Sequence, residues 1–194
     1  MPRAPRSGVA PAASELAPAA SPLPPADLDP RTGEPRRPVW AWVAGGLLFA
    51  ATGTILVALL VLMWDSVRRF DEASALHRLV RTELGDPLRA LLAAGDWTIA
   101  VLIGAAAAIA GYYGWAGHRW ARWAGVVAFA LGWGSLALNW LAPWCLLPLA
   151  LGAAALWLPQ LRPFYAAWDA ARQPAPTEPR DVGIVQYGPL PRYR

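Results

Sequence analysis

The residues of this chain that could carry chemistry are few and far apart. There is one cysteine, Cys145, and the two histidines are His77 and His118. A single cysteine excludes an intramolecular disulfide and a cysteine-based zinc site. The two histidines flank a long apolar run, so a helix formed by that run would hold them at its opposite ends. We therefore expect no metal site and no cofactor.

Cys145 and Ser135 are the two candidate nucleophiles, and each also has a simpler structural explanation. Cys145 is expected at the same end of the helices as His77, and a Cys–His pair would be a nucleophile with its base. Ser135 follows Gly132-Trp133-Gly134, a faint similarity to the Gly-x-Ser setting of intramembrane serine proteases. No histidine lies in that run to act as base. An isolated cysteine and a packed serine are the commoner arrangements, so we expect no catalytic residue.

His77 lies in an apolar stripe, where it is either an amphipathic filler or a pH-sensitive latch. The polar pair Ser135 and Asn139 is four residues apart and shares one face of its helix, with Thr98 or Thr54 as partners. We expect helix–helix polar contacts from Ser135, Asn139 and Thr98 rather than a polar path. No stretch matches a phosphate-binding loop or a dinucleotide fingerprint.

Four long apolar runs must position these side chains. They cover residues 39–64, 97–115, 123–141 and 144–158, and none contains Asp, Glu, Lys or Arg. A bilayer core of about 30 Å needs about 20 helical residues. We therefore predict an all-α membrane protein with four transmembrane helices, at 39–64, 96–117, 123–141 and 143–160, and a basic cytoplasmic turn at 118–122.

The last two runs are shorter than the first and are joined at Leu141-Ala142-Pro143, which predicts a close antiparallel hairpin. Pro148 falls inside the fourth run, so a hairpin that crosses only partly stays open. The second run is rich in Gly and Ala, and small residues let helices approach closely in lipid. We expect it to be central to the bundle.

Residues 65–95 form the one sizeable polar connection, and we predict a short helical cap on the extracytoplasmic side. Phe70, Ala73, His77, Val80 and Leu84 recur at spacings of three and four, as on one helix face. Gly85 is a stop signal, and Asp86-Pro87 is an N-cap followed by proline at the first helical position. Gly95-Asp96 repeats that device and predicts a break before the second span.

The two ends of the chain are polar and rich in proline. Residues 1–38 lack the large apolar side chains that would offset the entropy of ordering, so we expect them to be disordered. Residues 161–194 are expected to be a mostly disordered cytoplasmic tail, which starts with an interfacial helix containing Phe164, Tyr165 and Trp168.

Residues 182–194 of this tail combine a β-prone stretch with a proline-flanked aromatic and basic end. Such a stretch could add a strand to a partner's sheet or dock as a peptide. A solvated tail with weak membrane affinity is the alternative. The candidate partner-binding residues are Val182, Ile184, Val185, Tyr187, Pro189, Leu190, Pro191, Arg192 and Tyr193.

The formal net charge is +4 and every basic residue is arginine. These arginines are scattered over tails and loops, which does not favour nucleic acid as a partner. They are more numerous beside the two termini and the 118–122 turn than in the 65–95 loop, so both termini are expected in the cytoplasm. A chain without lysine, rich in Ala, Arg, Pro and Gly, indicates a bacterial source. With its four apolar runs we expect a multi-pass protein of the cell membrane, the plasma or inner membrane.

The function favoured by these patterns is a non-enzymatic accessory or scaffold subunit. Its partners would be the lipid bilayer and another membrane or membrane-associated protein, and a homo-oligomer stays open. The alternative is a small oligomeric transporter or channel subunit with Ser135, Asn139, Thr98 and Tyr112 along its path. An enzyme that uses Cys145 or His77 is the third hypothesis.

Overall fold

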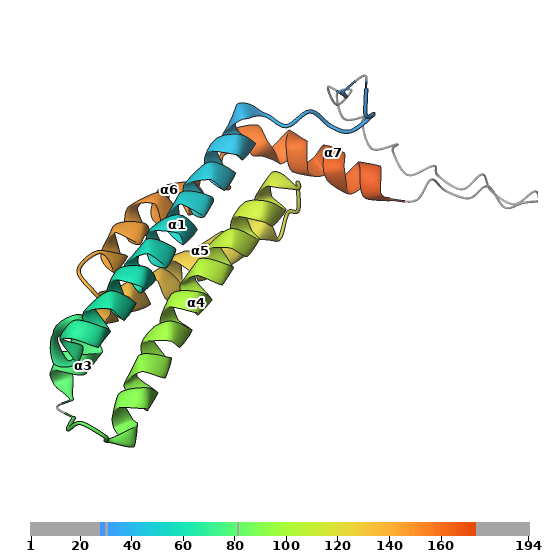
Figure 1. The fold of residues 1–194 in the computed structure, drawn as a ribbon. Helices are drawn as coiled ribbons and strands as arrows, with labels where there is room; N and C mark the ends of the chain where they lie inside the picture. Colours follow the sequence, from blue (N-terminus) through green and yellow to red (C-terminus); the bar gives the residue numbers. More distant parts are fainter. Residues whose placement is uncertain (1–27, 30, 81, 174–194) are drawn as a thin grey trace, which may run out of the picture.

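The computed structural model describes residues 28–173 except Pro30 and Arg81. Within that part of the chain the fold is helical, with one isolated bridge between Leu28 and Pro35 (Figure 1). The predicted all-helical class is confirmed. The α-helices are α1 (Val39–Arg68), α2 (Phe70–Ala73), α3 (Ala75–Leu79), α4 (Pro87–Trp115), α5 (Ala121–Gly132), α6 (Leu146–Ala155) and α7 (Arg162–Arg172); the 3₁₀ turns are η1 (Trp133–Ala137), η2 (Ala142–Cys145) and η3 (Pro159–Leu161).

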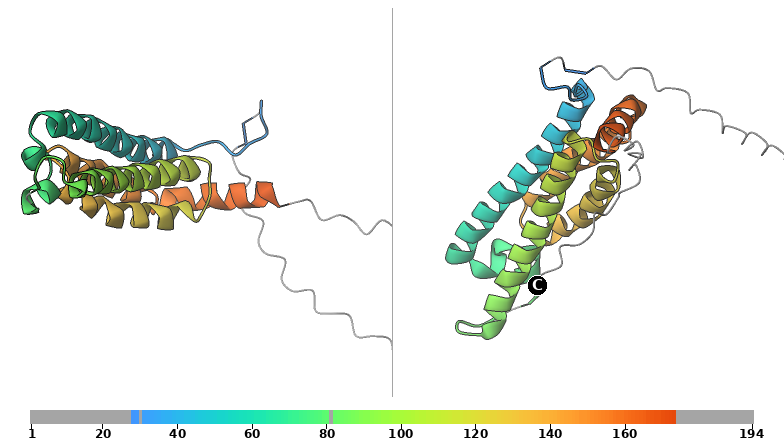
Figure 2. Two further views of the ribbon diagram at one scale, coloured as in Figure 1. Left: turned by 60° about the horizontal axis from the view of Figure 1, so that its bottom comes forward. Right: turned by 90° about the vertical axis from the view of Figure 1, so that its right-hand side faces the viewer.

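Helices α1 and α4 are the two long elements, and they lie side by side (Figures 1 and 2). At 30 and 29 residues they are each about 44 Å long, which exceeds the thickness of a bilayer core. Both are long and apolar enough to cross a membrane. A third span is formed if the segments Ala142–Ala155 and Pro159–Arg172, bent by 57° relative to each other, count as one.

The side-chain distribution of α1 is the inverse of that of a helix on a water-soluble protein. Its buried positions include the small residues Ala44 and Ala51, whereas Phe49, Leu56 and Leu60 are exposed. Large apolar side chains exposed along the whole length of a helix would be costly in water, but they are compatible with a lipid environment. The small buried residues let α1 approach α4 and α6 closely.

Helix α4 also presents its small residues inwards. Ala100, Gly104, Ala107 and Gly111 are buried against neighbouring helices. The hydroxyl of Thr52 on α1 donates to the Gly104 carbonyl at 3.1 Å. Helix α4 therefore packs against both α1 and α5, in line with the central place expected for this segment.

The chain from α5 to α6 turns back on itself beside α1 and α4. At its far end the Leu138 carbonyl accepts from the Ala75 amide at 3.2 Å. At its near end Leu161 packs against Ala41 of α1. Asn139 contacts Ala58 on α1, so the hairpin follows α1 over about 26 Å, the rise of the helix from Ala41 to Ala58.

Helix α7 crosses the end of the bundle where α1 begins and α4 ends (Figures 1 and 2). It buries Phe164 and Tyr165 against Ala41, and Trp168 packs beside them. A helix is therefore present where the sequence predicts one, over Arg162–Arg172. Arg172 from its last turn donates to the carbonyls of Ala116 and, at 3.0 Å, of Gly117, which follow α4.

The predicted break at Gly95-Asp96 does not occur. Helix α4 runs without interruption from Pro87 to Trp115, so it joins the second half of the connecting segment to the second span. The Asp96 carboxylate faces His77 instead of capping backbone amides. The start of α4 is as expected, because the Asp86 side chain accepts from the Leu88 amide at 2.9 Å and Pro87 opens the helix.

The amphipathic helix expected from Phe70 to Leu84 is two short helices. Ser74 is extended, with φ of −136° and ψ of 166°, and its hydroxyl caps α3 by accepting from the His77 amide at 3.1 Å. Serine is favoured at a helix N-cap, which explains the break. Ala73 and His77 of the stripe are buried, whereas Val80 and Leu84 are exposed.

Candidate functional site

The best candidate site is a buried polar cluster of Ser74, His77 and Asp96, here called the Asp96 cluster. His77 and Asp96 are each 1% exposed, and His77 Nε2 lies 3.1 Å from Asp96 Oδ2. The distance is that of an ion pair, although its angles fall short of a well-formed hydrogen bond. The Ser74 hydroxyl lies beside the same carboxyl group. A charged or polar group so deeply buried needs partners of this kind.

The contact of the second ring nitrogen of His77, Nδ1, indicates which tautomer of the imidazole is present. Nδ1 lies 2.8 Å from the Phe70 carbonyl, which can only accept, so Nδ1 must be protonated. Nε2 is then the ring nitrogen that faces the Asp96 carboxyl group.

Short local contacts hold the imidazole in this position. The Phe70 ring stacks on the His77 ring with centroids 4.0 Å apart. The Arg89 guanidinium in turn lies over the Phe70 ring, with Cζ 4.1 Å from its centroid. The N-cap at Ser74 sets the direction of α3 and so of His77. Asp96 arrives from α4, and the contact ties the segment after α1 to α4.

A cavity of about 190 Å³ borders the Asp96 cluster. Its lining residues come from the end of α1 and the first half of α4: Leu62, Met63, Ser66, Ala93, Asp96 and Trp97. Met63 and Trp97 of this lining are exposed.

The cluster does not have the geometry of a serine hydrolase. The Ser74 hydroxyl accepts from the His77 backbone amide, and both ring nitrogens of His77 face other groups. Without a base aimed at it, the hydroxyl stays a poor nucleophile. Within the described ranges, no three His, Cys, Asp or Glu side chains gather closely enough to hold a metal ion.

The structure does not form the Cys145–His77 pair weighed above. Cys145 is fully buried in η2, where it neighbours Ser135, and the ring nitrogens of His77 face Phe70 and Asp96. Burial in apolar surroundings makes a thiol unreactive. Cys145 is therefore a packing residue in this fold.

Asn139 is the polar residue that joins the hairpin to α1. Its Nδ2 donates to the Ala58 carbonyl at 2.6 Å, and its Oδ1 accepts from the amides of Leu141 and Ala142 at 3.3 and 3.0 Å. It thus closes the turn into η2 and fixes that turn on α1.

The other polar residues named for this region lie in different surroundings. Ser135 is fully buried and its hydroxyl has no well-formed hydrogen bond within the described residues. Thr98 is exposed and donates to Ala94 of its own helix, as Thr54 does to Ala50. Tyr112 is exposed on the outside of α4. These side chains are not brought together on one path.

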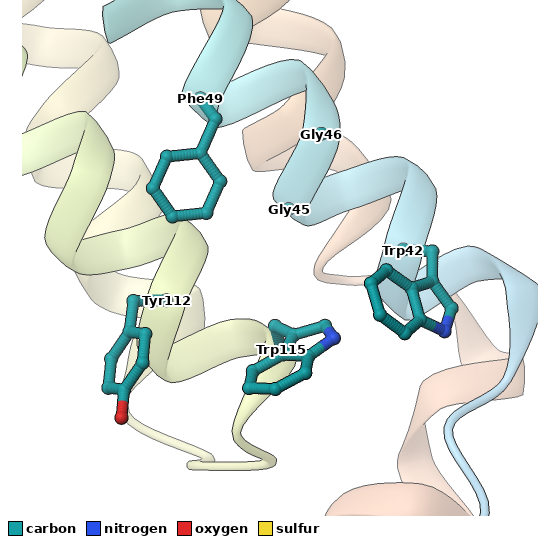
Figure 3. Close-up of a pocket in the computed structure, with 6 residues that line it drawn as sticks. All are labelled: Trp42, Gly45, Gly46, Phe49, Tyr112 and Trp115. Carbon is teal, nitrogen blue, oxygen red and sulfur yellow. The ribbon is translucent and has the colours of Figure 1, made fainter.

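A second cavity, of about 370 Å³, lies at the opposite end of α1 and α4. We call it the tryptophan groove; it is lined by Trp42, Gly45, Gly46, Phe49, Tyr112 and Trp115 (Figure 3). The rings of Trp42 and Trp115 meet edge to face with centroids 5.5 Å apart. Gly45 and Gly46 leave the hollow between those rings and Phe49 (Figure 3).

A third polar group surrounds His118 in the turn between α4 and α5. Its Nδ1 lies 3.3 Å from Arg172 Nη2, and Asp169 pairs with both Arg119 and Arg172, at 3.6 and 3.8 Å. Desolvation and then the Arg172 charge lower the pKa of His118 below its usual value near 6.5, against the opposing effect of Asp169. A neutral imidazole at this place accepts from Arg172.

The candidate partner-binding residues of the tail, from Val182 to Tyr193, lie outside the residues that the structure describes. Compared with known protein families, with curated proteins and with solved structures, the chain matches none of them. Over residues 28–173, apart from Pro30 and Arg81, the fold and its exposed apolar surface define the class of the protein: a helical protein with two or three helices suited to crossing a membrane.

Sequence patterns missed the most polar feature of the fold. Asp96 was expected to cap a span, which left no ionisable group inside one. It lies inside α4, which is itself a candidate span. The available signal was the pair Ser74 and His77: a serine N-cap three residues before a histidine in an apolar stripe points that imidazole inwards.

Proposed function

We propose that this protein is an integral membrane protein that crosses the bilayer four times and acts as a non-enzymatic accessory or scaffold subunit. The observation that carries the proposal is the use of its polar side chains. Asn139, Thr52 and the Asp96 cluster each bond to another helix of the same chain. Because these polar groups are used for internal packing, the outer surface of the bundle is apolar and faces lipid and partner helices.

The hairpin supports the count of four crossings. It follows α1 from Ala41 to Ala58, over about 26 Å, close to the thickness of about 30 Å that a bilayer core presents. The hairpin is short, and its 3₁₀ turns leave backbone groups without α-helical hydrogen bonds. Asn139 compensates at the turn, because its side chain accepts from two backbone amides there.

The distribution of charge supports an orientation with both termini in the cytoplasm. The membrane in this proposal is the inner membrane of a bacterial cell. Among described residues, the end that carries α7 holds more Arg than acidic residues, namely Arg31, Arg36, Arg37, Arg119, Arg122, Arg162 and Arg172 against Asp29, Glu34 and Asp169. At the other end, residues 65–96, acidic side chains outnumber arginines. Positive residues stay on the cytoplasmic side.

The scaffold proposal is tested by quantitative crosslinking in native membranes. The full chain is compared with a variant lacking residues 182–194 and with a matched variant lacking residues 2–14. We expect one membrane or membrane-associated protein to be crosslinked reproducibly to the full chain and to be lost only when residues 182–194 are removed. Equal crosslinking patterns for all three chains would contradict the proposal.

A small transporter or channel subunit is the second candidate, and the cavity beside Asp96 favours it. A buried carboxylate that lines a cavity is an arrangement that transport proteins use for protons and cations. Proton or cation flux into liposomes that is lost in Asp96→Asn would support this candidate. A scaffold predicts the same background leak for wild type and variant.

A further inference from the structure

We propose that the tryptophan groove binds one acyl chain of an anionic phospholipid, whose phosphate is held at Arg37. The groove has the size of a ligand site, at about 370 Å³, and lies on the outside of the α1–α4 pair. Its exposed rings, Trp42, Phe49 and Tyr112, face the surroundings of the bundle. An apolar hollow there is filled by lipid chain rather than by water.

The glycines give the groove its depth. A Cβ at Gly46 would meet no atom within 4 Å, so the space above it is open. A Cβ at Gly45 would touch only the Gly111 carbonyl and Trp115 Cβ, at 3.6 and 3.7 Å. The hollow therefore runs along α1 between the Phe49 ring and the Trp42–Trp115 pair (Figure 3).

Aromatic and basic residues place the headgroup at the Trp115 end. Tryptophan and tyrosine prefer the headgroup region of a bilayer, and Trp42, Tyr112 and Trp115 lie together there. The Arg37 guanidinium covers the Trp115 ring, with Cζ 4.2 Å from its centroid, and the same Cζ lies 5.6 Å from the Trp168 centroid. Both rings hold the charge of Arg37 at the mouth of the groove.

Arg37 is able to take a phosphate in this position. Its Nη2 pairs with Glu34 Oε2 at 3.3 Å, a partly exposed contact of the kind that contributes little stability. Its Nε is buried and has no hydrogen-bond partner within the described residues. A guanidinium binds phosphate through two parallel hydrogen bonds, and a phosphate is a stronger partner for it than an exposed carboxylate.

The charge of Arg37 selects an anionic rather than a zwitterionic lipid. One basic residue near an anionic surface strengthens binding by about fivefold. Phosphatidylglycerol and phosphatidylcholine with identical acyl chains share the phosphate and differ in net charge, so they are matched probes.

Native mass spectrometry of the full chain tests the proposal by counting retained lipid. We expect phosphatidylglycerol to be retained about fivefold more than phosphatidylcholine, and inorganic phosphate not to displace it. Arg37→Gln should reduce the ratio to about one, whereas Arg68→Gln, which removes an arginine stacked on Trp64 at the other end, should leave it unchanged.

Gly46→Leu tests the groove itself, because the new side chain fills it without meeting the backbone. We expect loss of both lipids. Gly53→Leu is the matched control on the same helix, since a Cβ there also meets nothing within 4 Å and Gly53 is outside the groove. Equal retention by the two leucine variants, or equal retention of the two lipids by wild type, would overturn the proposal.

A wild-type measurement covers the case in which Gly46→Leu does not fold. Phosphatidylglycerol with brominated acyl chains should quench tryptophan fluorescence more than brominated phosphatidylcholine at the same mole fraction. The excess should shrink when Trp115→Phe removes the ring under Arg37. Identical quenching by both lipids would also overturn the proposal.

Discussion

At the scale of single residues, stability depends on a few polar side chains buried where water cannot reach. The His77–Asp96 contact is the deepest of these, because both side chains are 1% exposed and each is the other's partner. The contact joins α3 to α4 and so closes one end of the bundle. Removing one member leaves the other buried without its partner in the pair.

Asp96→Ala is therefore expected to destabilise the protein by about 3–5 kcal/mol, the usual effect of breaking a buried pair. His77→Ala should cost a similar amount, and the double variant less than the sum of the two. Thermal or SDS unfolding of the four proteins in detergent measures this cycle. Glu72→Ala, which breaks the exposed Arg69–Glu72 pair, is the control and should change little. Additive single effects would show that the two residues do not interact.

Asn139→Leu is expected to destabilise by about 1–3 kcal/mol, since the amides of Leu141 and Ala142 lose their acceptor and Ala58 loses a donor. Thr98→Val is the control: its hydroxyl bonds only to its own helix, so the effect should stay within about 0.5 kcal/mol. The same unfolding experiment compares them. A larger loss in Thr98→Val would contradict the assignment of Asn139 as the interhelical contact.

At the scale of elements, the docking of α7 depends on the turn after α4. Gly117 has a φ of +76°, and the amides of Gly117 and His118 bond to the carbonyls of Gly114 and Tyr113, which is the Schellman motif that ends a helix. A Cβ at Gly117 would also lie 2.5 Å from Trp168 Cδ1 of α7. The glycine serves both the turn and the contact.

Gly117→Ala should therefore cost more than the strain of a left-handed alanine, which is about 1–3 kcal/mol, and should detach α7. Gly85→Ala is the matched control, because Gly85 has a φ of +93° but open space around its Cβ position. Amide exchange of residues 162–172 should rise in Gly117→Ala and stay unchanged in Gly85→Ala. Equal protection in both variants would show that Trp168 does not need the space at Gly117.

The docking of α7 should also weaken in acid. The pKa of His118 is lowered in the folded protein, mainly by desolvation and then by Arg172, so folding favours the neutral imidazole. That stabilisation is complete above the usual pKa near 6.5 and is lost as the pH falls through the lowered value. Exchange of residues 162–172, corrected for intrinsic rates, should rise from pH 8 to pH 5. His118→Gln should flatten this dependence; an unchanged slope would contradict it.

At the scale of the whole molecule, the hairpin decides how many times the chain crosses the membrane. Its turn lies near Ala58, and Leu161 at the end of its second arm packs against Ala41, so the turn and the α7 end are held apart along α1. The exposed Trp140 marks the turn, and the exposed Arg119 marks the opposite end of the bundle.

Four crossings predict that Trp140→Cys and Leu84→Cys react with a membrane-impermeant maleimide added outside cells, whereas Arg119→Cys reacts only after the membrane is opened. A Cys145→Ala background removes the native thiol, which is buried in any case. Labelling of positions 140 and 119 from the same side would show a hairpin that enters and leaves on one face.

The sequence by itself determined what depends on neighbours along the chain. Apolar composition predicted helices suited to a membrane, Asp86-Pro87 predicted the start of α4, and Phe164, Tyr165 and Trp168 predicted an interfacial helix. These features follow from local backbone preference and from the solvent that each segment tolerates, so nearby residues are enough to decide them.

The tertiary structure decided which polar groups meet. Asn139 bonds to Ala58, 81 residues away, and His77 turns Asp96 from an expected cap into a buried partner inside a continuous helix. The tryptophan groove likewise exists because Gly45 of α1 lies against Gly111 and Trp115 near the end of α4. Such contacts depend on how helices rotate and stagger against each other, and the small residues that permit close packing leave that rotation open in the sequence.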